Sequence, residues 1–577
     1  MKSIVYKLSV AALSAMAFAA CDDFLDELPD NRTTLDSEEK LQKFMVSAYP
    51  THDPMTFGEY MSDNVDDTGE NNPYTDRFLD ECYTWADVTE TDNSDPESYW
   101  NDLNMCIETA NTALAAIKEQ GNPKKYDAIR AEALLCRAYA HFMLVNYFGM
   151  HYDVNDNTSL GVAIIDEPET ELNPKYERAT VKETYAKIQE DIEEALPLVS
   201  DSYYKVPKYH FTQAAAYGFA TRFYLFSCQW DKAIETANVV MGTNPSSMLR
   251  DWEVMGDMVS KFEAIFRHYI SASIPANLML LTSYSDAGLN FGPYYVGKRY
   301  AHAAYIGENE TVNALAALWG GNYSSYFFQI KRYSGTNLNC WSKWSLPYLF
   351  EYTDPVANIG YSHTVYNAFT ADEVLLSRAE AYIMKGTQDP AYFDKAAEDM
   401  TIWMQKISKT AASKNLKLTP ASIQAFMARF KYSYDTAKED SLGLESTIKK
   451  HLNPKFAIDK EGSVQESMLQ LVLAMRRFET LHEGKRWLDI KRYGIVIPRR
   501  QLDASGKPSV VTDWLTVDDP RRAIQIPQKA IDAGFTPNPR NGSNGQSGKV
   551  SPNGKDNDRY VSPIDESQMA EDCLVKE

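Results

Sequence analysis

Two segments of the sequence combine a helical period with small side chains at the positions where paired helices would cross. In both, apolar and small residues recur at intervals of three and four. In the first, residues 212–240, these residues are Tyr217, Ala220, Thr221, Tyr224, Trp230, Ala233 and Ala237. The second begins at Thr370, breaks at Gly386 and continues to Met400. This spacing predicts amphipathic helices, and the alternation of large and small side chains predicts that the helices pack closely in pairs.

Further helices follow from the same period and from capping signals. The spacing predicts helices over residues 100–114, 126–147 and 467–483, and a Thr-x-x-Glu capping box at 180–183 opens another. From Pro498 onward, Pro, Gly, Asn and Asp dominate, which is typical of irregular structure. We therefore predict a mainly α fold. A scaffold of helical pairs, similar to tetratricopeptide repeats, would carry a long irregular, loop-rich region with a few short strands.

The N-terminus has the organisation of a bacterial lipoprotein precursor. Lys2 and Lys7 precede an apolar run, residues 8–20, which ends in small residues directly before Cys21. Such a run is a secretory signal peptide that is too short to span a bilayer, and a cysteine at this position is the residue that becomes acylated. The alternative is an ordinary cleaved signal followed by an incidental cysteine.

The lipoprotein interpretation sets the first boundaries and the location of the protein. We predict a signal peptide over residues 1–20 and an acylated, flexible tether over 21–40. The acidic residues 22–27 resemble a surface-export signal. Two or more acyl chains give stable anchoring, so the expected location is the outer membrane, lipid-anchored and facing the cell exterior.

The charge of the chain restricts its partners. The 577 residues carry a formal net charge of −22, and loss of the two leader lysines brings it to −24. A surface this acidic repels phosphate groups, which argues against nucleic acid and against membrane contact other than through the lipid anchor. The cysteines after Cys21 are scattered without the spacing of a zinc site, so we predict no metal and no cofactor.

Aromatic and planar polar side chains suited to sugar binding are concentrated in two regions. Aromatic faces stack on the apolar C–H faces of sugars, and Asp, Asn and Arg pair with hydroxyl groups. The first region, residues 63–85, contains the candidates Asp67, Arg77 and Trp85. The second, residues 284–348, contains Tyr284, Tyr295, Trp319, Tyr323, Tyr326 and Trp341. Two glycines follow Trp319, and we expect them to leave the neighbouring rings exposed.

Metal-binding and catalytic interpretations are weaker. The polar segment 63–69 lacks the spacing and the terminal Glu of an EF-hand, so a polar turn is expected there. Glu479 and Glu483 lie one helical turn apart beside Lys485 and Arg486, which predicts ion pairs on a solvated face rather than acid–base catalysis. No nucleophile motif is found, and we predict no catalytic residues.

One segment near the C-terminus resembles a known family. Residues 478–494, FETLHEGKRWLDIKRYG, are similar to the C-terminal signature of SusD/RagB-like proteins, the surface lipoproteins of outer-membrane nutrient uptake. Further matches in chain order are 131–149, 178–196 and 523–539. The resemblance implies a tetratricopeptide-like scaffold over residues 41–270 and a second region over 271–577 that carries ligand loops and further helical repeats.

The resemblance also implies a function. Such proteins act as a hinged lid over a SusC-like TonB-dependent transporter and hold an oligosaccharide, or in some members a peptide, before import, without catalysis. The leading hypothesis is therefore a surface-anchored glycan-binding protein. A peptide-binding member of the family, a surface glycoside hydrolase and a pure protein–protein scaffold are the alternatives.

Overall fold

The computed structural model describes most of the chain between residues 34 and 540. The described residues are 34–169, 175–258, 262–291, 298–328, 331–334, 338–342, 346–434 and 444–540. The predicted signal peptide, the lipidation site Cys21 and the candidate Tyr295 lie outside them. None of the helices in the described part of the chain combines the length and apolarity that a membrane span requires.

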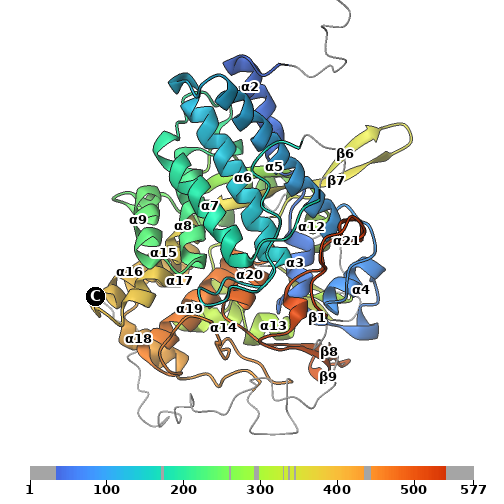
Figure 1. Ribbon diagram of the computed structural model, residues 1–577. Helices are drawn as coiled ribbons and strands as arrows, with labels where there is room; N and C mark the ends of the chain where they lie inside the picture. The colour runs from blue at the N-terminus through green and yellow to red at the C-terminus, as the bar shows by residue number, and fades with distance from the viewer. Residues whose placement is uncertain are drawn as a thin grey trace, which may run out of the picture.

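The N-terminal half contains long helices that lie side by side (Figure 1). They are α2 (Glu38–Met45), α5 (Pro96–Glu119), α6 (Asp127–Phe148) and α7 (Val181–Ala195). The capping box predicted at 180–183 is present, and α5 is capped by an aspartate. The Asp95 carboxylate accepts the Ser98 N–H at the start of α5, and Thr180 and Glu183 form a reciprocal capping box on α7. The periodicity and the capping box therefore located α5, α6 and α7, whereas α2 was not predicted.

The two segments with small residues at crossing positions form helical pairs. They are α8 (Gln213–Phe226) with α9 (Trp230–Met241), and α15 (Ala371–Lys385) with α16 (Ala391–Ile407). Ala220, Ala233 and Ala237 are fully buried. A Cβ at Gly386 would lie 2.2 Å from the Phe393 ring, so the glycine at this break lets the second helix pack closely on the first. The predicted pairing is confirmed.

A third helical pair follows in the C-terminal half, α18 (Pro420–Met427) with α19 (Val464–Glu479). The predicted helix over 467–483 ends earlier than expected, at Glu479, because His482 and Gly484 adopt φ values of +68° and +71°. The shorter helices are α3 (Met55–Met61), α4 (Arg77–Tyr83), α10 (Trp252–Asp257), α11 (Phe262–Tyr269), α12 (Ala287–Phe291), α13 (Ala304–Asn309), α14 (Val312–Ala316), α17 (Lys409–Ser413), α20 (Arg486–Arg492) and α21 (Gln528–Asp532).

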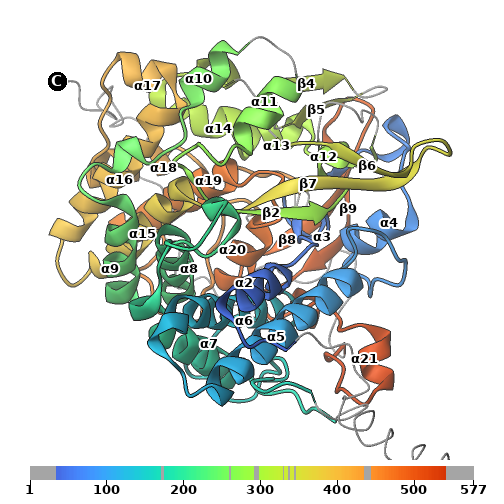
Figure 2. The ribbon, with the colours of Figure 1, turned by 90° about the horizontal axis from the view of Figure 1, so that it is seen from above.

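The strands form small sheets that join distant parts of the chain. One has the order β3 (Tyr300–Ala301), β1 (Asp66–Asp67), β8 (Ile497–Leu502), β9 (Pro508–Leu515). Another has the order β2 (Asn277–Tyr284), β7 (Ile359–Thr370), β6 (Leu349–Asp354), and β4 (Lys331–Ser334) pairs with β5 (Asn339–Ser342). The β6–β7 hairpin projects from the body (Figures 1 and 2). The predicted mainly α class with a few short strands is confirmed.

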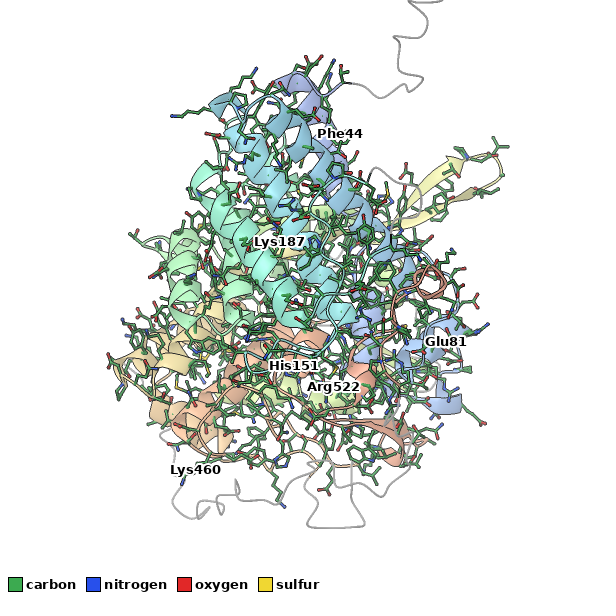
Figure 3. The ribbon with its side chains drawn as sticks, viewed as in Figure 1. Phe44, Glu81, His151, Lys187, Lys460 and Arg522 are labelled. Atoms are coloured by element: carbon green, nitrogen blue, oxygen red, sulfur yellow. The ribbon has the colours of Figure 1, made fainter. Side chains whose placement is uncertain are left out.

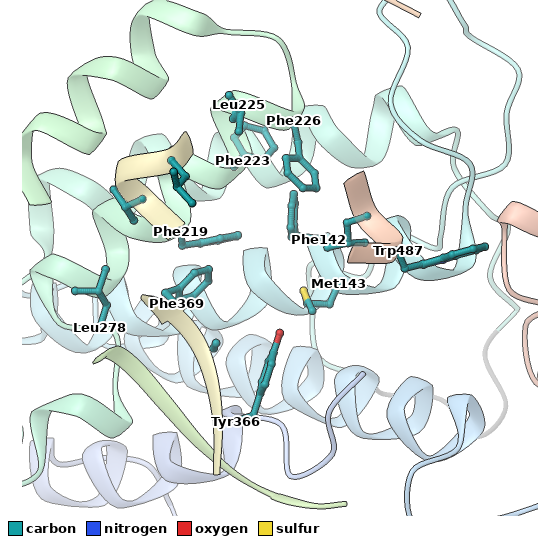
Figure 4. Close-up of a cluster of buried hydrophobic side chains, with 14 of the residues drawn as sticks. Phe142, Met143, Phe219, Phe223, Leu225, Phe226, Leu278, Tyr366, Phe369 and Trp487 are labelled. Atoms are coloured by element: carbon teal, nitrogen blue, oxygen red, sulfur yellow. The ribbon is translucent and has the colours of Figure 1, made fainter. Parts of the chain in front are cut away.

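Helices and strands share one hydrophobic core (Figure 4). Phe219 of α8 lies with its ring centroid 5.6 Å from those of Phe142 in α6 and Phe369 in β7. Tyr366 and Trp487 line the same cluster. Side chains from both halves of the sequence therefore fill one interior, and the loop-rich second half is held against the helical scaffold by apolar burial.

Candidate ligand-binding surface

The two regions that the sequence singles out lie side by side in the structure. Strand β1 pairs antiparallel with β3, so that Asp66 faces Ala301 and Asp67 faces Tyr300. Just beyond the strands, the Tyr74 carbonyl accepts the Arg299 N–H at 2.9 Å. Residues 66–74 and 298–301 thus run along one another, and α4 and α12 occupy the same side of the molecule in both ribbon views.

Asp67 has a structural partner at this junction. Its carboxylate accepts two hydrogen bonds from the Arg299 guanidinium, at 2.8 and 2.9 Å, and the Gly69 N–H at 2.7 Å. The Asp67 side chain is one-tenth exposed. Bidentate pairing occupies both oxygens in fixed geometry, so in this arrangement Asp67 holds the two segments together. Its role as a ligand residue remains a prediction.

Four of the predicted ring residues are not surface residues. Trp85, Trp319, Tyr326 and Trp341 are all at least 97% buried. The Trp85 indole donates to the Met61 carbonyl at 2.8 Å, and the Arg499 guanidinium lies 3.9 Å from its ring centroid. The expectation that these four rings form an exposed stacking platform is therefore wrong for this structure. Trp85, Trp319 and Tyr326 satisfy their polar groups inside the protein, as buried Trp and Tyr usually do.

The glycines after Trp319 were expected to leave the neighbouring rings exposed, but they help to bury them. The Trp319 indole donates to the Ser325 hydroxyl at 2.7 Å. A Cβ at Gly321 would lie 2.4 Å from that hydroxyl and 2.9 Å from the Trp319 ring. Gly320 adopts φ +69° and ends the helical turn. The glycines thus let the chain fold tightly over the indole and bury it. Tyr326 packs edge-on against it with ring centroids 5.3 Å apart.

Some tyrosine rings do lie at the surface. Tyr284 at the end of β2 is 36% exposed, Tyr361 in β7 is 47% exposed and Tyr74 is 56% exposed. The Tyr284 ring lies 5.7 Å from the ring of Tyr361 and 5.7 Å from that of His52, measured between centroids. Of the predicted ring residues, Tyr284 is thus exposed. Tyr323 is half-buried, edge-on to Trp341 at 5.6 Å.

Carboxylates adjoin these rings. Asp286 follows Tyr284 by two residues, and its N–H donates to the Ser94 hydroxyl at 3.0 Å. The Ser94 N–H in turn donates to the Asp92 carboxylate at 2.9 Å. Burial raises the pKa of Asp92, and the nearby charge of Asp286 raises it further. We call Tyr74, Tyr284, Tyr361, Asp92 and Asp286 the tyrosine surface.

One cation lies among these acidic groups. Burial lowers the pKa of Lys298, which is opposed by the charges of Asp76, Asp286 and Asp92. The backbone of Lys298 pairs with that of Tyr74 in an isolated parallel bridge. The bridge therefore places the backbone of Lys298 beside that of Tyr74, and the charges of Asp76, Asp92 and Asp286 attract the lysine ammonium. The tyrosine surface thus combines aromatic faces with hydrogen-bond acceptors and a donor, which is the chemistry that hydroxyl-rich ligands require.

Arg77 lies at the start of α4, near this surface. Its guanidinium donates to Glu81 at 2.9 Å, and its side chain is 62% exposed. Glu81 is labelled at the edge of the molecule in Figure 3. The guanidinium remains accessible to solvent, so the predicted ligand role of Arg77 is compatible with its placement and stays a prediction.

Two sequence models of one family match the chain in succession. A model described as "Starch-binding associating with outer membrane" matches residues 23–225. A model described as "SusD family" matches residues 297–572, which include the signature 478–494. Together they span most of the sequence.

The chain belongs to the SusD/RagB-like family. Solved structures share its fold. A SusD superfamily protein from Bacteroides vulgatus ATCC 8482 has a TM-score of 0.58 at 18% identity, covering 88% of this chain and 99% of that chain. One from Bacteroides thetaiotaomicron VPI-5482 has a TM-score of 0.51 at 18% identity, covering 87% and 98%. A putative sugar binding protein from B. vulgatus ATCC 8482 has a TM-score of 0.52 at 17% identity, covering 88% and 99%. No curated protein matches the sequence.

The SusD/RagB-like signature and the preceding Arg477 form a buried charge network in this chain. Arg486 donates two hydrogen bonds to the Asp63 carboxylate, at 2.8 and 2.9 Å. Arg477 donates to the Asp63 carbonyl at 2.6 Å and to Glu310 at 3.0 Å. Burial alone would raise the pKa of Asp63, but the guanidiniums of Arg477 and Arg486 hold it well below its usual range. The segment 63–69, for which a polar turn was predicted, begins in a turn and is anchored by buried ion pairs of Asp63.

The two glutamates of the SusD/RagB-like signature are also buried. Glu479 accepts the Trp403 indole N–H at 3.0 Å, and Glu483 accepts the Tyr269 hydroxyl at 2.6 Å. Lys485 lies 3.3 Å from Glu483 and 3.1 Å from Glu373. Ion pairing occurs as predicted, but the expectation of a solvated face was wrong, because segments from both halves of the chain cover these residues.

Sequence reasoning missed Tyr74, Tyr361, Asp92 and Asp286. Tyr361 lies in the outer part of β7, in the β6–β7 hairpin, where exposed and half-buried residues alternate. Such alternation is a strand signal that the sequence contains. The other three lie in loops, whose proximity depends on long-range pairing. Among the described residues, no group of three or more His, Cys, Asp or Glu side chains is arranged to hold a metal ion.

Proposed function

We propose that this protein is a surface-anchored binding protein that captures oligosaccharides and delivers them to a partner TonB-dependent outer-membrane transporter. The tyrosine surface is the proposed capture site, and Cys21 is the proposed lipid anchor. The observation that carries the proposal is the exposure of the neighbouring rings of Tyr284 and Tyr361, with Asp286 two residues after Tyr284 and linked to Asp92 through Ser94.

The family supports the same ligand class. One matching family model is described as starch-binding, and one structural neighbour is described as a putative sugar binding protein. Ring stacking with a few hydrogen bonds gives dissociation constants of about micromolar to millimolar, or about −4 to −8 kcal/mol. Such affinity suits capture followed by release to a transporter.

Binding of the purified mature chain to a panel of oligosaccharides, measured by titration calorimetry, tests the proposal. Tyr284→Ala and Asp286→Asn should each weaken binding at least about tenfold, or about 1.4 kcal/mol. Tyr352→Ala is a matched control, because Tyr352 is 53% exposed on the same sheet. Its neighbour Glu351 pairs with Tyr361, so strand alternation places Tyr352 on the opposite face.

The outcomes separate the proposal from its rivals. Equal affinity in Tyr284→Ala, Asp286→Asn and the control would rule out the tyrosine surface as the capture site.

The acidic groups Asp76, Asp92 and Asp286 favour a second candidate ligand, cationic peptides. Binding of a Lys-rich peptide in the absence of any oligosaccharide binding would support it. Release of reducing sugar would instead indicate a glycoside hydrolase.

Delivery and anchoring have separate tests. Lipidation at Cys21 predicts that the wild-type chain fractionates with the outer membrane and that Cys21→Ala does not. Delivery predicts that the tagged wild-type chain co-purifies with a TonB-dependent transporter from detergent-solubilised outer membranes. Failure of co-purification under conditions that preserve the oligosaccharide affinity would count against the transporter role.

A further inference from the structure

A cleft lies near Tyr74, one member of the tyrosine surface. It has a volume of about 680 Å³ and opens between α13, the start of β5 and the turn that joins β8 to β9. Its lining includes Tyr305, Glu308, Asn339, Glu445, Leu502 and Lys507. This volume is within the range of small-molecule sites in proteins.

The cleft has an apolar floor and a polar rim. Ala303, Leu338 and Leu502 are buried and form a small hydrophobic cluster of their own beneath it. On the rim, Glu308 and Glu445 are exposed. Their two carboxylates outweigh the single ammonium of Lys507, which disfavours phosphate and other anions. An apolar floor under planar acceptors and donors suits a neutral, hydroxyl-rich ligand.

The cleft and the tyrosine surface are joined by one short segment of chain. Asn71 donates to the Asp503 carbonyl at 3.3 Å, beside the β8–β9 turn. The Asn72 amide lies 3.7 Å from the Cys340 sulfur, next to Asn339 of the cleft. Two residues later, Tyr74 belongs to the tyrosine surface. Segment 71–74 therefore has the cleft at one end and the tyrosine surface at the other.

We propose that the cleft is a second subsite for the same oligosaccharide, so that one chain occupies both the cleft and the tyrosine surface. This inference rests on the proposed function, and it specifies the ligand as an extended oligosaccharide rather than a single sugar. Once the first subsite is filled, a long chain presents its remaining units to the cleft at high effective concentration. Affinity should therefore rise with chain length, whereas a short ligand should use the tyrosine surface alone.

Malto-, cello- and xylo-oligosaccharides of about two and about eight units are suitable probes. In the wild-type chain, the long form of the bound series should bind at least about tenfold more tightly than the short form. Ala504→Trp places a bulky ring at an exposed position of the cleft lining. It should remove the gain for the long form and leave the short form unchanged. Ala357→Trp, at an exposed position in the β6–β7 turn, is the matched control and should change neither.

A second variant tests whether the effect of Ala504→Trp comes from a local folding defect. The double substitution Glu308→Gln and Glu445→Gln keeps the size of two exposed side chains and should lower the affinity of the long form alone. If both cleft variants bind the long form as wild type does while Tyr284→Ala weakens it, the second subsite is overturned and the capture function stands. If no oligosaccharide binds the wild-type chain, the proposed function fails and the subsite falls with it.

Discussion

Arg486 donates two hydrogen bonds to Asp63 across 423 residues of sequence, and both side chains are buried. The pair connects helix α20 to the segment that leads into β1, and β1 in turn pairs with β3 beside the tyrosine surface. A residue of the family signature thus acts far from the surface that we assign to ligand capture. It does so by fixing the segment before β1, which pairs with β3 next to the bridge between Tyr74 and Lys298.

Removing one partner of this pair should destabilise the fold strongly. Arg486→Met leaves the Asp63 carboxylate buried with less compensation, which typically costs about 3–5 kcal/mol. Arg77→Met is the matched control, since Arg77 is 62% exposed and its pair with Glu81 should contribute at most about 1 kcal/mol. Urea unfolding of both variants measures the difference. Equal stabilities would show that the buried pair contributes no more than a surface pair.

The variants Trp319→Ala and Tyr284→Ala should distinguish a residue that packs in the core from one that binds the ligand. Trp319→Ala removes a fully buried indole and should lower the free energy of unfolding by about 3–5 kcal/mol. Tyr284→Ala truncates an exposed ring and should cost less than about 1 kcal/mol. Thermal unfolding together with oligosaccharide titration checks both. A Trp319→Ala protein with wild-type stability but reduced affinity would indicate that Trp319 is a binding residue and not a packing residue.

Asp53 should give stability a pH dependence. The buried carboxylate accepts hydrogen bonds from the Met55 N–H at 2.9 Å and from the hydroxyls of Ser283 and Ser285. Burial raises its pKa to about 6, from an ordinary value of 3.8. Because the folded pKa is the higher one, the contribution of Asp53 to stability is present in full below about pH 4 and is lost as pH rises to about 6.

The expected size of this loss is on the order of 3 kcal/mol, from a shift of about two pKa units. Asp53→Asn removes the titrating group. The stability of the wild-type chain relative to this variant should therefore fall between pH 4 and pH 7 in urea titrations. Parallel stability profiles over this range would contradict the assignment.

Substitution of Gly484 should destabilise the protein more than substitution of Gly121, a glycine of similar backbone conformation. Gly484 and Gly121 adopt φ values of +71° and +81°. A Cβ at Gly484 would lie 2.4 Å from the Pro54 carbonyl oxygen, whereas nothing lies within 4 Å of one at Gly121. Gly121→Ala should cost about 1–2 kcal/mol for the backbone alone. Gly484→Ala should cost about 1–3 kcal/mol more because of the clash. Chemical denaturation of both variants checks the order, and a smaller loss at Gly484 would refute it.

Local sequence signals determined the helices and the family. Periodicity placed α5, α6, α8 and α9, the capping box at Thr180 located the start of α7, and Ala220 and Ala233 marked a helix crossing. These signals depend on neighbours within one or two turns, so a sequence contains them directly.

Tertiary structure alone decided which polar and aromatic groups face solvent. Both Trp319 and Tyr284 were predicted to be exposed, yet the indole is buried under the turn at Gly321, whereas the tyrosine ring lies at the exposed end of a mostly buried strand. The charged signature appeared suited to a solvated face, yet Glu380 and Asp63 from distant segments pair with its arginines in the interior. Burial depends on which distant segments meet, because a charge leaves water only when its partners arrive from elsewhere in the chain. Contacts between residues far apart in the sequence, rather than local sequence patterns, therefore determined which side chains form the proposed ligand-binding surface.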